Sequence, residues 1–118
     1  MDLFDASRDD CGVYKSFDLL GKKWSLPMLI MFWNNPGEEL KFSNFSSMST
    51  TITGRIISMR LKEFESLNIV SKFVDGGKTS YMLTQSGLEL REVYVRVQEW
   101  THSNSSCDCG EDCISHSQ

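Results

Sequence analysis

Residues 41–67 read KFSNFSSMSTTITGRIISMRLKEFESL, and the spacing of apolar residues in this stretch decides the fold. Its first half has an apolar residue at every third position: Phe42, Phe45 and Met48. This spacing predicts a short helix capped by Ser43 rather than a Ser- and Thr-rich linker. A longer amphipathic helix follows, with Thr53 as its N-cap. Its apolar stripe consists of Ile56, Ile57, Leu61, Phe64 and Leu67. Two helices joined by a brief polar turn are a candidate helix-turn-helix.

Two further helices are expected before this pair. The first has apolar residues at helical spacing: Tyr14, Phe17 and Leu20. It ends at Gly21. Residues 24–33 are apolar almost all round, with Pro27 near the first turn, so this second helix belongs in the core. Residues 34–37 form a turn.

Beyond Asn68 the helical period gives way to that of strands. The apolar residues are Ile69, Val70, Phe73 and Val74, then Tyr81, Met82 and Leu83. Residues 75–78 lie between the two groups and contain two glycines, which predicts a β-hairpin with a glycine turn. From Thr84 the helical period returns. One apolar face is formed by Leu90, Val93, Tyr94, Val97 and Trp100.

This order of elements predicts an α+β fold that is mainly α: a winged helix-turn-helix with a two-stranded wing and an added C-terminal helix. We assign residues 11–101 to this domain and residues 102–118 to a polar, Cys-rich tail. A chain of 118 residues with 40% hydrophobic residues suits one globular core.

The formal net charge of −4 argues against a nucleic-acid partner, but the distribution of charge along the chain permits one. Residues 41–82 carry six basic and three acidic groups, a balance of +3, between flanks of −3 and −4. Residues 1–10 contain four Asp in place of the basic and apolar regions of a secretory signal. The longest apolar segment, residues 26–33, is less than half of the ~20 residues that a membrane helix needs. We therefore expect a cytoplasmic protein without a membrane span.

Five separate motifs, in the same order, are similar to those of a known family. They are LGKKWSL at residues 20–26, KFSNF at 41–45, the stretch from Ile52 through RLKEFE at 60–65, YMLTQSG at 81–87, and a closing Trp100. Over residues 11–100 the chain resembles the HxlR-type regulators, which are relatives of the MarR regulators. The resemblance implies a homodimer joined through its first and last helices, a recognition helix in the major groove of double-stranded DNA, and the hairpin as wing.

Two positions depart from the family pattern. Gly12 stands where the family usually has Pro after an early Cys, and Asn68 stands where it has Gly before the hairpin. Neither change threatens the fold, because Asn also tolerates a left-handed backbone.

The helix that begins after Thr53 presents a face opposite its apolar stripe. This face consists of Gly54, Arg55, Ser58, Met59 and Lys62. Arg55 is the best candidate for base readout and Ser58 a second, while Gly54 lets the backbone approach phosphate. A helix that shows its polar side to water would look the same, but the helix-turn-helix context favours DNA.

Other candidate DNA contacts flank this face. Arg60 matches an arginine of the family motif, and either phosphate contact or a structural ion pair would explain it. Thr51 and Thr53 lie where hydroxyls meet phosphate at a helix start, although capping alone also explains them. In the expected wing, Lys72 and Lys78 can reach the DNA backbone or minor groove without reading sequence.

Cys11 occupies the place of the family's early cysteine, a thiol that in several members senses oxidants or electrophiles. Sensing requires an accessible thiol with a lowered pKa, and a quiet buried cysteine is the alternative. In the tail, Cys107, Cys109 and Cys113 lie within seven residues, with His102 and His116 on either side. Three thiolates and one imidazole would suit zinc or another thiophilic metal, but disulfide chemistry and no function remain open.

The leading interpretation is a transcriptional regulator that binds operator DNA, with an oxidant, an electrophile or a small molecule as effector. The alternative is a small thiol redox or metal-binding protein that uses a winged helix for protein contacts. An enzyme is not expected, because the sequence contains no Cys-x-x-Cys in a βαβ setting and no glycine-rich phosphate loop.

Overall fold

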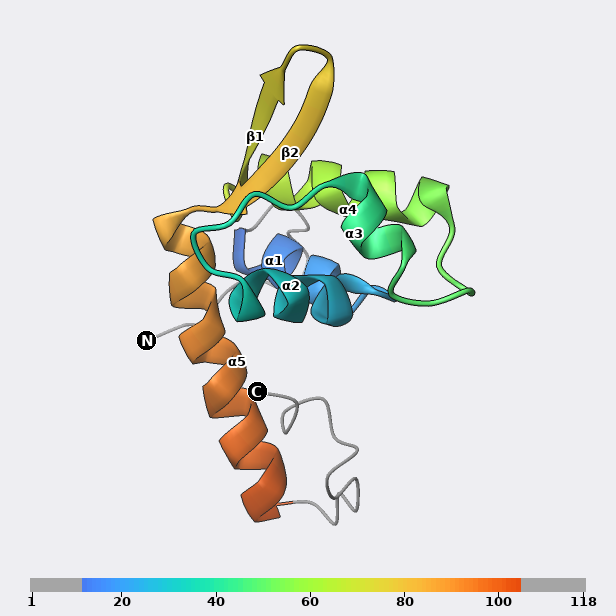
Figure 1. Ribbon diagram of the computed structural model, residues 1–118. Helices are drawn as coiled ribbons and strands as arrows, with labels where there is room; N and C mark the ends of the chain where they lie inside the picture. The colour runs from blue at the N-terminus through green and yellow to red at the C-terminus, as the bar shows by residue number, and fades with distance from the viewer. Residues whose placement is uncertain (1–11, 105–118) are drawn as a thin grey trace.

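The computed structural model describes residues 12–104, which form helices and a two-stranded antiparallel sheet in the predicted order (Figure 1). The elements are α1 (Gly12–Leu20), α2 (Ser25–Asn34), α3 (Phe42–Ser46), α4 (Gly54–Ser66), β1 (Val70–Asp75), β2 (Lys78–Leu83) and α5 (Gln85–Asn104). The predicted winged helix-turn-helix is confirmed. None of the described helices is long and apolar enough to cross a membrane.

The helix-turn-helix pair, α3 and α4, is capped by two different side chains. The prediction that Ser43 caps α3 is wrong, because the helix begins at Phe42 and Ser43 lies inside it. Lys41 is the N-cap, and its backbone N–H donates to Oδ1 of Asn44 at 2.7 Å. The predicted cap of α4 is confirmed: Oγ1 of Thr53 accepts a hydrogen bond from the backbone N–H of Ile56 at 3.3 Å.

The hairpin of β1 and β2 turns at Gly76 and Gly77, whose φ angles are +56° and +83°. Glycine adopts such angles without strain, as a two-residue hairpin turn requires. Asn68, which precedes β1, has a φ of +61°, so the expected left-handed residue is present. Leu40 also pairs with Tyr81 through two backbone hydrogen bonds, which ties the loop before α3 to the free edge of β2.

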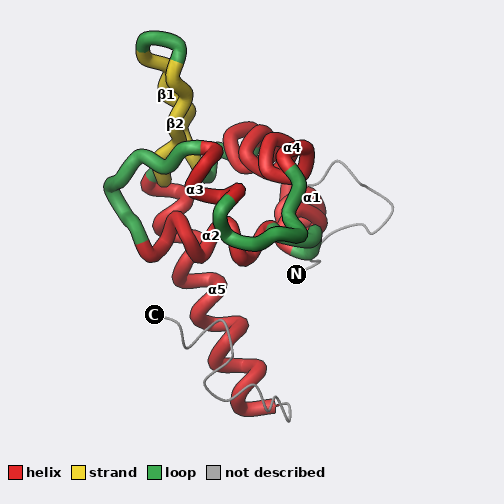
Figure 2. Tube along the Cα trace, turned by 45° about the vertical axis from the view of Figure 1, so that its right-hand side comes forward, coloured by secondary structure: helices red, strands yellow, loops and turns green. Residues whose placement is uncertain are grey.

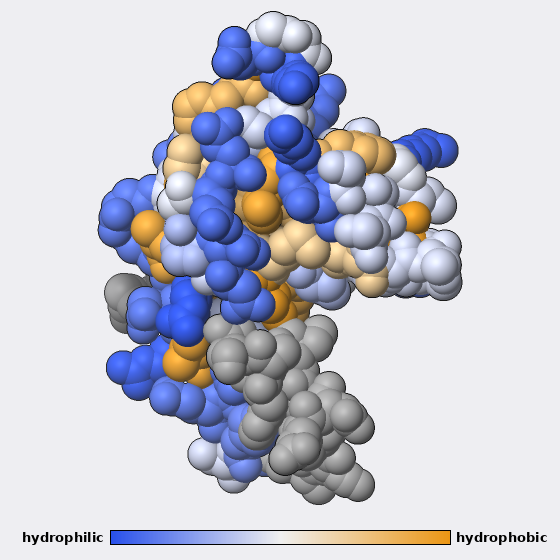
Figure 3. Space-filling view, viewed as in Figure 1, coloured by the Kyte–Doolittle hydropathy of each residue, from blue (hydrophilic) through white to orange (hydrophobic). Residues whose placement is uncertain are grey.

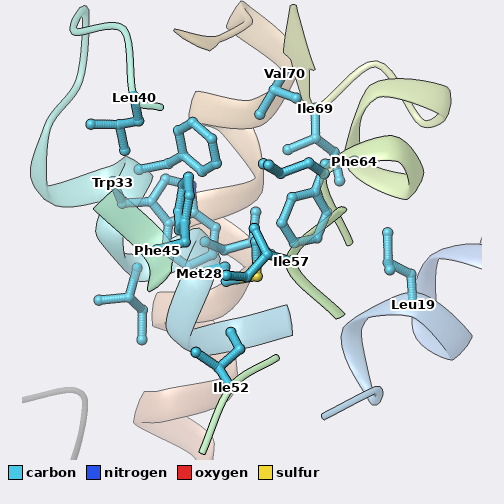
Figure 4. Close-up of a cluster of buried hydrophobic side chains, with 14 residues drawn as sticks. Leu19, Met28, Trp33, Leu40, Phe45, Ile52, Ile57, Phe64, Ile69 and Val70 are labelled. Carbon is cyan, nitrogen blue, oxygen red and sulfur yellow. The ribbon is translucent and has the colours of Figure 1, made fainter. Parts of the chain in front are cut away.

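The core forms where α2 lies against α3, α4 and the start of the hairpin (Figure 4). As predicted, α2 is largely buried, and the ring of Phe32 lies 5.2 Å from that of Phe45 between ring centres. The indole of Trp33 donates to the carbonyl of Gly87 at 3.0 Å, which fixes the start of α5 against the core. Figures 1 and 2 both show α5 running away from this helical body, on the opposite side from the hairpin.

Candidate nucleic-acid interface

The outward face of α4 carries three residues at helical spacing, Arg55, Met59 and Lys62. All three side chains are exposed, while Ile57 and Leu61 on the opposite face are buried in the core. This exposed stripe therefore consists of two cationic side chains and one apolar side chain. Ser58 is exposed beside it. The predicted contacts Arg55, Ser58, Met59 and Lys62 are therefore available to a ligand.

Gly54 begins α4, and the structure gives it a packing role. A Cβ built at this position would lie 3.1 Å from Cζ of Phe42 in α3. The absence of a side chain therefore lets the aromatic ring of α3 approach the start of α4. Gly54 is exposed, as the predicted approach to phosphate requires, but close helix packing already explains the glycine.

The segment that enters α4 exposes both predicted threonines. The hydroxyl of Thr51 lies 2.9 Å from that of Ser49, and the hydroxyl of Thr53 caps the helix. The first backbone N–H groups of α4 carry the positive end of the helix dipole. These features leave phosphate contact at Thr51 and Thr53 as a prediction.

The sequence left two interpretations of Arg60 open, a phosphate contact and a structural ion pair. The structure shows the ion pair. Only 6% of the residue is exposed. Its Nε donates to the carbonyl of Lys23 at 3.0 Å, and its Nη1 donates to Oε1 of Glu63 at 2.8 Å. A guanidinium used in this way cannot reach a phosphate, so the expected DNA contact at Arg60 is corrected.

Glu63 connects α4 to the turn between α1 and α2. Its Oε2 accepts a hydrogen bond from Nζ of Lys22 at 2.8 Å, and its other oxygen binds Arg60. Partial burial raises the pKa of the Glu63 carboxyl, but hydrogen bonds from Lys22 and Arg60 and their charges outweigh burial, so its pKa lies below the usual value. We call Lys22, Arg60 and Glu63 the ion cluster.

A groove of about 450 Å³ separates α4 from the wing. It is lined by Phe42, Ser58, Leu61, Lys62, Glu65, Lys72, Thr79 and Tyr81. The predicted contacts Ser58, Lys62 and Lys72 thus come together on one concave surface. Lys78 lies apart from them at the tip of the wing, where it is exposed.

Sequence reasoning missed the roles of Thr79 and Tyr81 in this groove, although a signal was present. A two-residue turn at Gly76 and Gly77 sets the register of the hairpin, and that register pairs Tyr81 with Lys72. Because paired residues share a face of the sheet, the face that carries Lys72 also carries Tyr81.

A second feature of the surface lies away from α4, on α1 and α5. Of the predicted apolar face of α5, Leu90 and Tyr94 pack against the core, whereas the other members are exposed. The exposed large apolar residues of the two helices are Val13, Tyr14, Phe17, Leu88, Val93, Val97 and Trp100. Phe17 is 70% exposed and Trp100 64%. Figure 3 shows apolar residues exposed among hydrophilic ones along the arm that α5 forms.

Most of the predicted thiol and metal residues lie outside the described residues. They are Cys11, Cys107, Cys109, Cys113 and His116. His102 lies in the last turn of α5. Residues 12–104 contain no group of three or more His, Cys, Asp or Glu that could hold a metal ion. The redox and metal sites therefore stay predictions.

Comparison with known proteins identifies the family of the chain. A family model described as HxlR-like helix-turn-helix matches residues 19–108. The HTH-type transcriptional regulator YybR from Bacillus subtilis (strain 168) is 29% identical over 101 residues, which are 83% of this chain and 78% of that protein.

Two solved regulators have the same fold. The reduced form of YodB from Bacillus subtilis matches with a TM-score of 0.66 and 28% identity, covering 83% of this chain and 95% of that chain. The reduced form of the redox regulator HypR matches with a TM-score of 0.61 and 29% identity, covering 80% and 93%. Structures of quinone-bound and diamide-treated YodB and of oxidised HypR match as well.

Proposed function

Because the chain belongs to the HxlR-like helix-turn-helix family and is a DNA-binding transcriptional regulator, we propose that it binds its operator as a homodimer in the cytoplasm. In this proposal α4 enters the major groove and the hairpin of β1 and β2 contacts the adjacent backbone or minor groove. The observation that carries the proposal is the exposed stripe of Arg55, Met59 and Lys62, which lies beside the groove that holds Lys72.

In this arrangement the proposed contacts have two separate roles, base readout and phosphate binding. Arg55 lies in the first turn of α4, where recognition helices reach base edges, and a guanidinium can bind O6 and N7 of guanine together. Lys62, Lys72 and Lys78 would neutralise phosphates, which positions the protein but carries no sequence information. Thr51, Thr53 and the first N–H groups of α4 would complete the phosphate contacts.

The exposed apolar face of α1 and α5 supports the homodimer. Seven large apolar side chains are exposed on α1 and α5, and exposed apolar surface of this kind marks protein interfaces. A two-fold axis through this face would present two copies of α4 to half-sites about one helical turn of DNA apart.

We further propose that the thiol of Cys11 makes DNA binding sensitive to oxidants or electrophiles. YodB has been solved in reduced, quinone-bound and diamide-treated forms, and HypR in reduced and oxidised forms. Cys11 directly precedes Gly12, the first residue of α1. The turn that follows α1 is joined to α4 by the hydrogen bond between Lys22 and Glu63. A movement of α1 would therefore be transmitted to α4, the proposed recognition helix.

The test is fluorescence anisotropy of a labelled fragment from upstream of the protein's own gene, titrated with fully reduced and mildly oxidised protein. We expect the reduced protein to bind with an affinity that falls steeply as salt rises, since each neutralised phosphate releases counterions. Oxidised protein should release the DNA, and Cys11→Ser should abolish that difference. A chain cut after Asn104 removes Cys107, Cys109 and Cys113 and serves as the matched control.

If the protein binds no DNA at every salt concentration measured, the proposal is overturned. It would favour the alternative, a thiol redox or metal-binding protein that uses the winged helix for protein contacts. Equal binding by reduced and oxidised protein would retain the regulator and remove only the role of Cys11.

A further inference from the structure

Met59 lies at the centre of the outward stripe of α4, four residues after Arg55 and three before Lys62. Its side chain is 40% exposed, although apolar residues of α4 otherwise turn towards the core. Helical spacing places Met59 on the same face as both cations. A ligand that is drawn to those charges must therefore also cover the thioether.

We propose that Met59 reads the 5-methyl group of a thymine in the major groove, so that each operator half-site contains a thymine opposite this residue. The inference rests on the proposed function, because it names what the recognition helix reads. It makes Met59 a specificity-determining residue, distinct in chemistry from Arg55.

The chemistry of the two surfaces leads to this assignment. When α4 enters the groove, the water around Met59 is expelled, and the thioether offers only a weak acceptor in its place. A base edge rich in donors or acceptors would lose hydrogen bonds to water without gaining any, which costs free energy. The thymine methyl is the apolar group that a base pair presents in the major groove. Thymine is therefore favoured both by the contact it makes and by the loss that the other bases suffer.

The neighbouring residues support a contact at base depth rather than at the backbone. Arg55, one turn before Met59, is long enough to reach guanine, and Lys62 is placed to hold a phosphate beside the groove. Met59 lies between Arg55 and Lys62 on the same face of α4, between the proposed base contact and the proposed phosphate contact. Its unbranched side chain can adjust to the position of a methyl group without moving the helix.

The first stage of the test is selection of bound sequences from a random double-stranded DNA library. Wild-type protein, Met59→Gln and Met59→Leu are compared, with Val74→Ala as a matched control that shortens an exposed apolar side chain of the wing instead. Wild type and Met59→Leu should enrich a thymine at one position of each half-site, and Met59→Gln should not. Val74→Ala should enrich the same thymine as wild type. Thermal unfolding followed by circular dichroism checks that every variant is folded.

The second stage replaces that thymine by deoxyuridine, which removes the methyl group and nothing else. Loss of one buried methyl contact should weaken binding by wild type about fourfold, and binding by Met59→Gln should not change.

Three outcomes are distinguishable. A fourfold loss confined to proteins with Met59 or Leu at this position supports the inference. An enriched site whose thymines tolerate deoxyuridine equally in wild type and Met59→Gln overturns the inference while DNA binding stands. Failure to enrich any sequence from the library overturns the proposed function and the inference with it.

Discussion

At the scale of the residue, Arg55 and Lys78 represent the two kinds of DNA contact that this surface can make. Arg55 is in the first turn of α4, and Lys78 is at the tip of the wing. The first is placed for base edges and the second for phosphate. Their removal should therefore have different consequences for specificity.

We predict that Arg55→Ala weakens binding to the operator by about 1–3 kcal/mol and lowers the preference for operator over scrambled DNA by a similar amount. Lys78→Ala should weaken binding to both DNAs alike and reduce the slope of log affinity against log salt by about one. Anisotropy titrations with both DNAs at several salt concentrations measure the two effects. If Arg55→Ala reduced affinity for both DNAs equally, Arg55 would be a phosphate contact.

The ionisation of Glu63 affects the described fold, because its carboxylate binds both Lys22 and the buried Arg60. Its pKa is lower in the folded protein than the ordinary value of about 4.3 for a free Glu. The stability that follows from this shift is therefore fully present above the unfolded pKa and is lost as the pH falls through the folded value.

We predict that Glu63→Gln lowers the free energy of unfolding by about 1–3 kcal/mol at pH 7, because Arg60 loses a charged partner. The difference from wild type should shrink as the pH falls below the ordinary pKa of Glu and through the lower pKa of Glu63 in the folded protein. Urea unfolding at pH 7 and pH 3.5 measures this, with the exposed Glu65→Gln as control. A difference that is the same at both pH values would show that the charge of Glu63 does not stabilise the fold.

At the scale of the element, the start of α5 is held against the hairpin by a close backbone approach. Oγ1 of Thr84 accepts a hydrogen bond from the N–H of Gly87 at 3.0 Å and so caps the helix. A Cβ at Gly87 would overlap the carbonyl group of Ile69, which is backbone and cannot move aside. Glycine is required here by packing rather than by its φ angle.

We predict that Gly87→Ala lowers the free energy of unfolding by at least about 1–3 kcal/mol, the usual cost of overpacking. Gly12→Ala is the matched control, because a Cβ at Gly12 meets no atom within 4 Å and alanine favours the helix. Chemical unfolding of the two variants measures both values. Equal stability of Gly87→Ala and wild type would mean that α5 can shift along the hairpin.

Only part of each element was predictable from its own residues. The cap at Thr53 and the turn at Gly76 and Gly77 follow from local chemistry, and both are confirmed. The cap of α3 was misplaced, because Ser43 is a good capping residue whereas the actual N-cap, Lys41, is not a preferred type, and Asn44 at N3 bonds the backbone N–H of Lys41. Lys41 directly follows Leu40, whose pairing with Tyr81 is a contact between distant segments.

At the scale of the whole molecule, the helical body, the wing and the arm of α5 point in different directions (Figure 2). The exposed apolar side chains of α1 and α5 lie on other helices than the stripe on α4 that is proposed to bind DNA. A partner on this face would leave the recognition helix free, and the separation of the two half-sites would depend on how the arms pack.

We predict that Val97→Glu converts the proposed homodimer to monomers, because a charge would be buried in the proposed interface. Affinity for an operator with two half-sites should then fall at least tenfold, while affinity for a single half-site should hardly change. Sedimentation velocity and anisotropy measure the two effects, and Ser103→Glu places the same charge on an exposed polar position as control. A dimeric Val97→Glu would place the interface elsewhere.

The sequence by itself determined the order of the elements, the recognition helix and its outward stripe, and the glycine turn of the wing. Each of these depends on periodicity or on backbone preferences within a few residues, so the signal is local. Tertiary structure alone decided that Arg60 is buried against the carbonyl of Lys23 and that Lys62 and Lys72 share a groove. It also decided that three of the five residues on the predicted apolar face of α5 remain exposed. These features depend on how distant segments pack, and a helical pattern shows which residues share a face without showing what that face will meet.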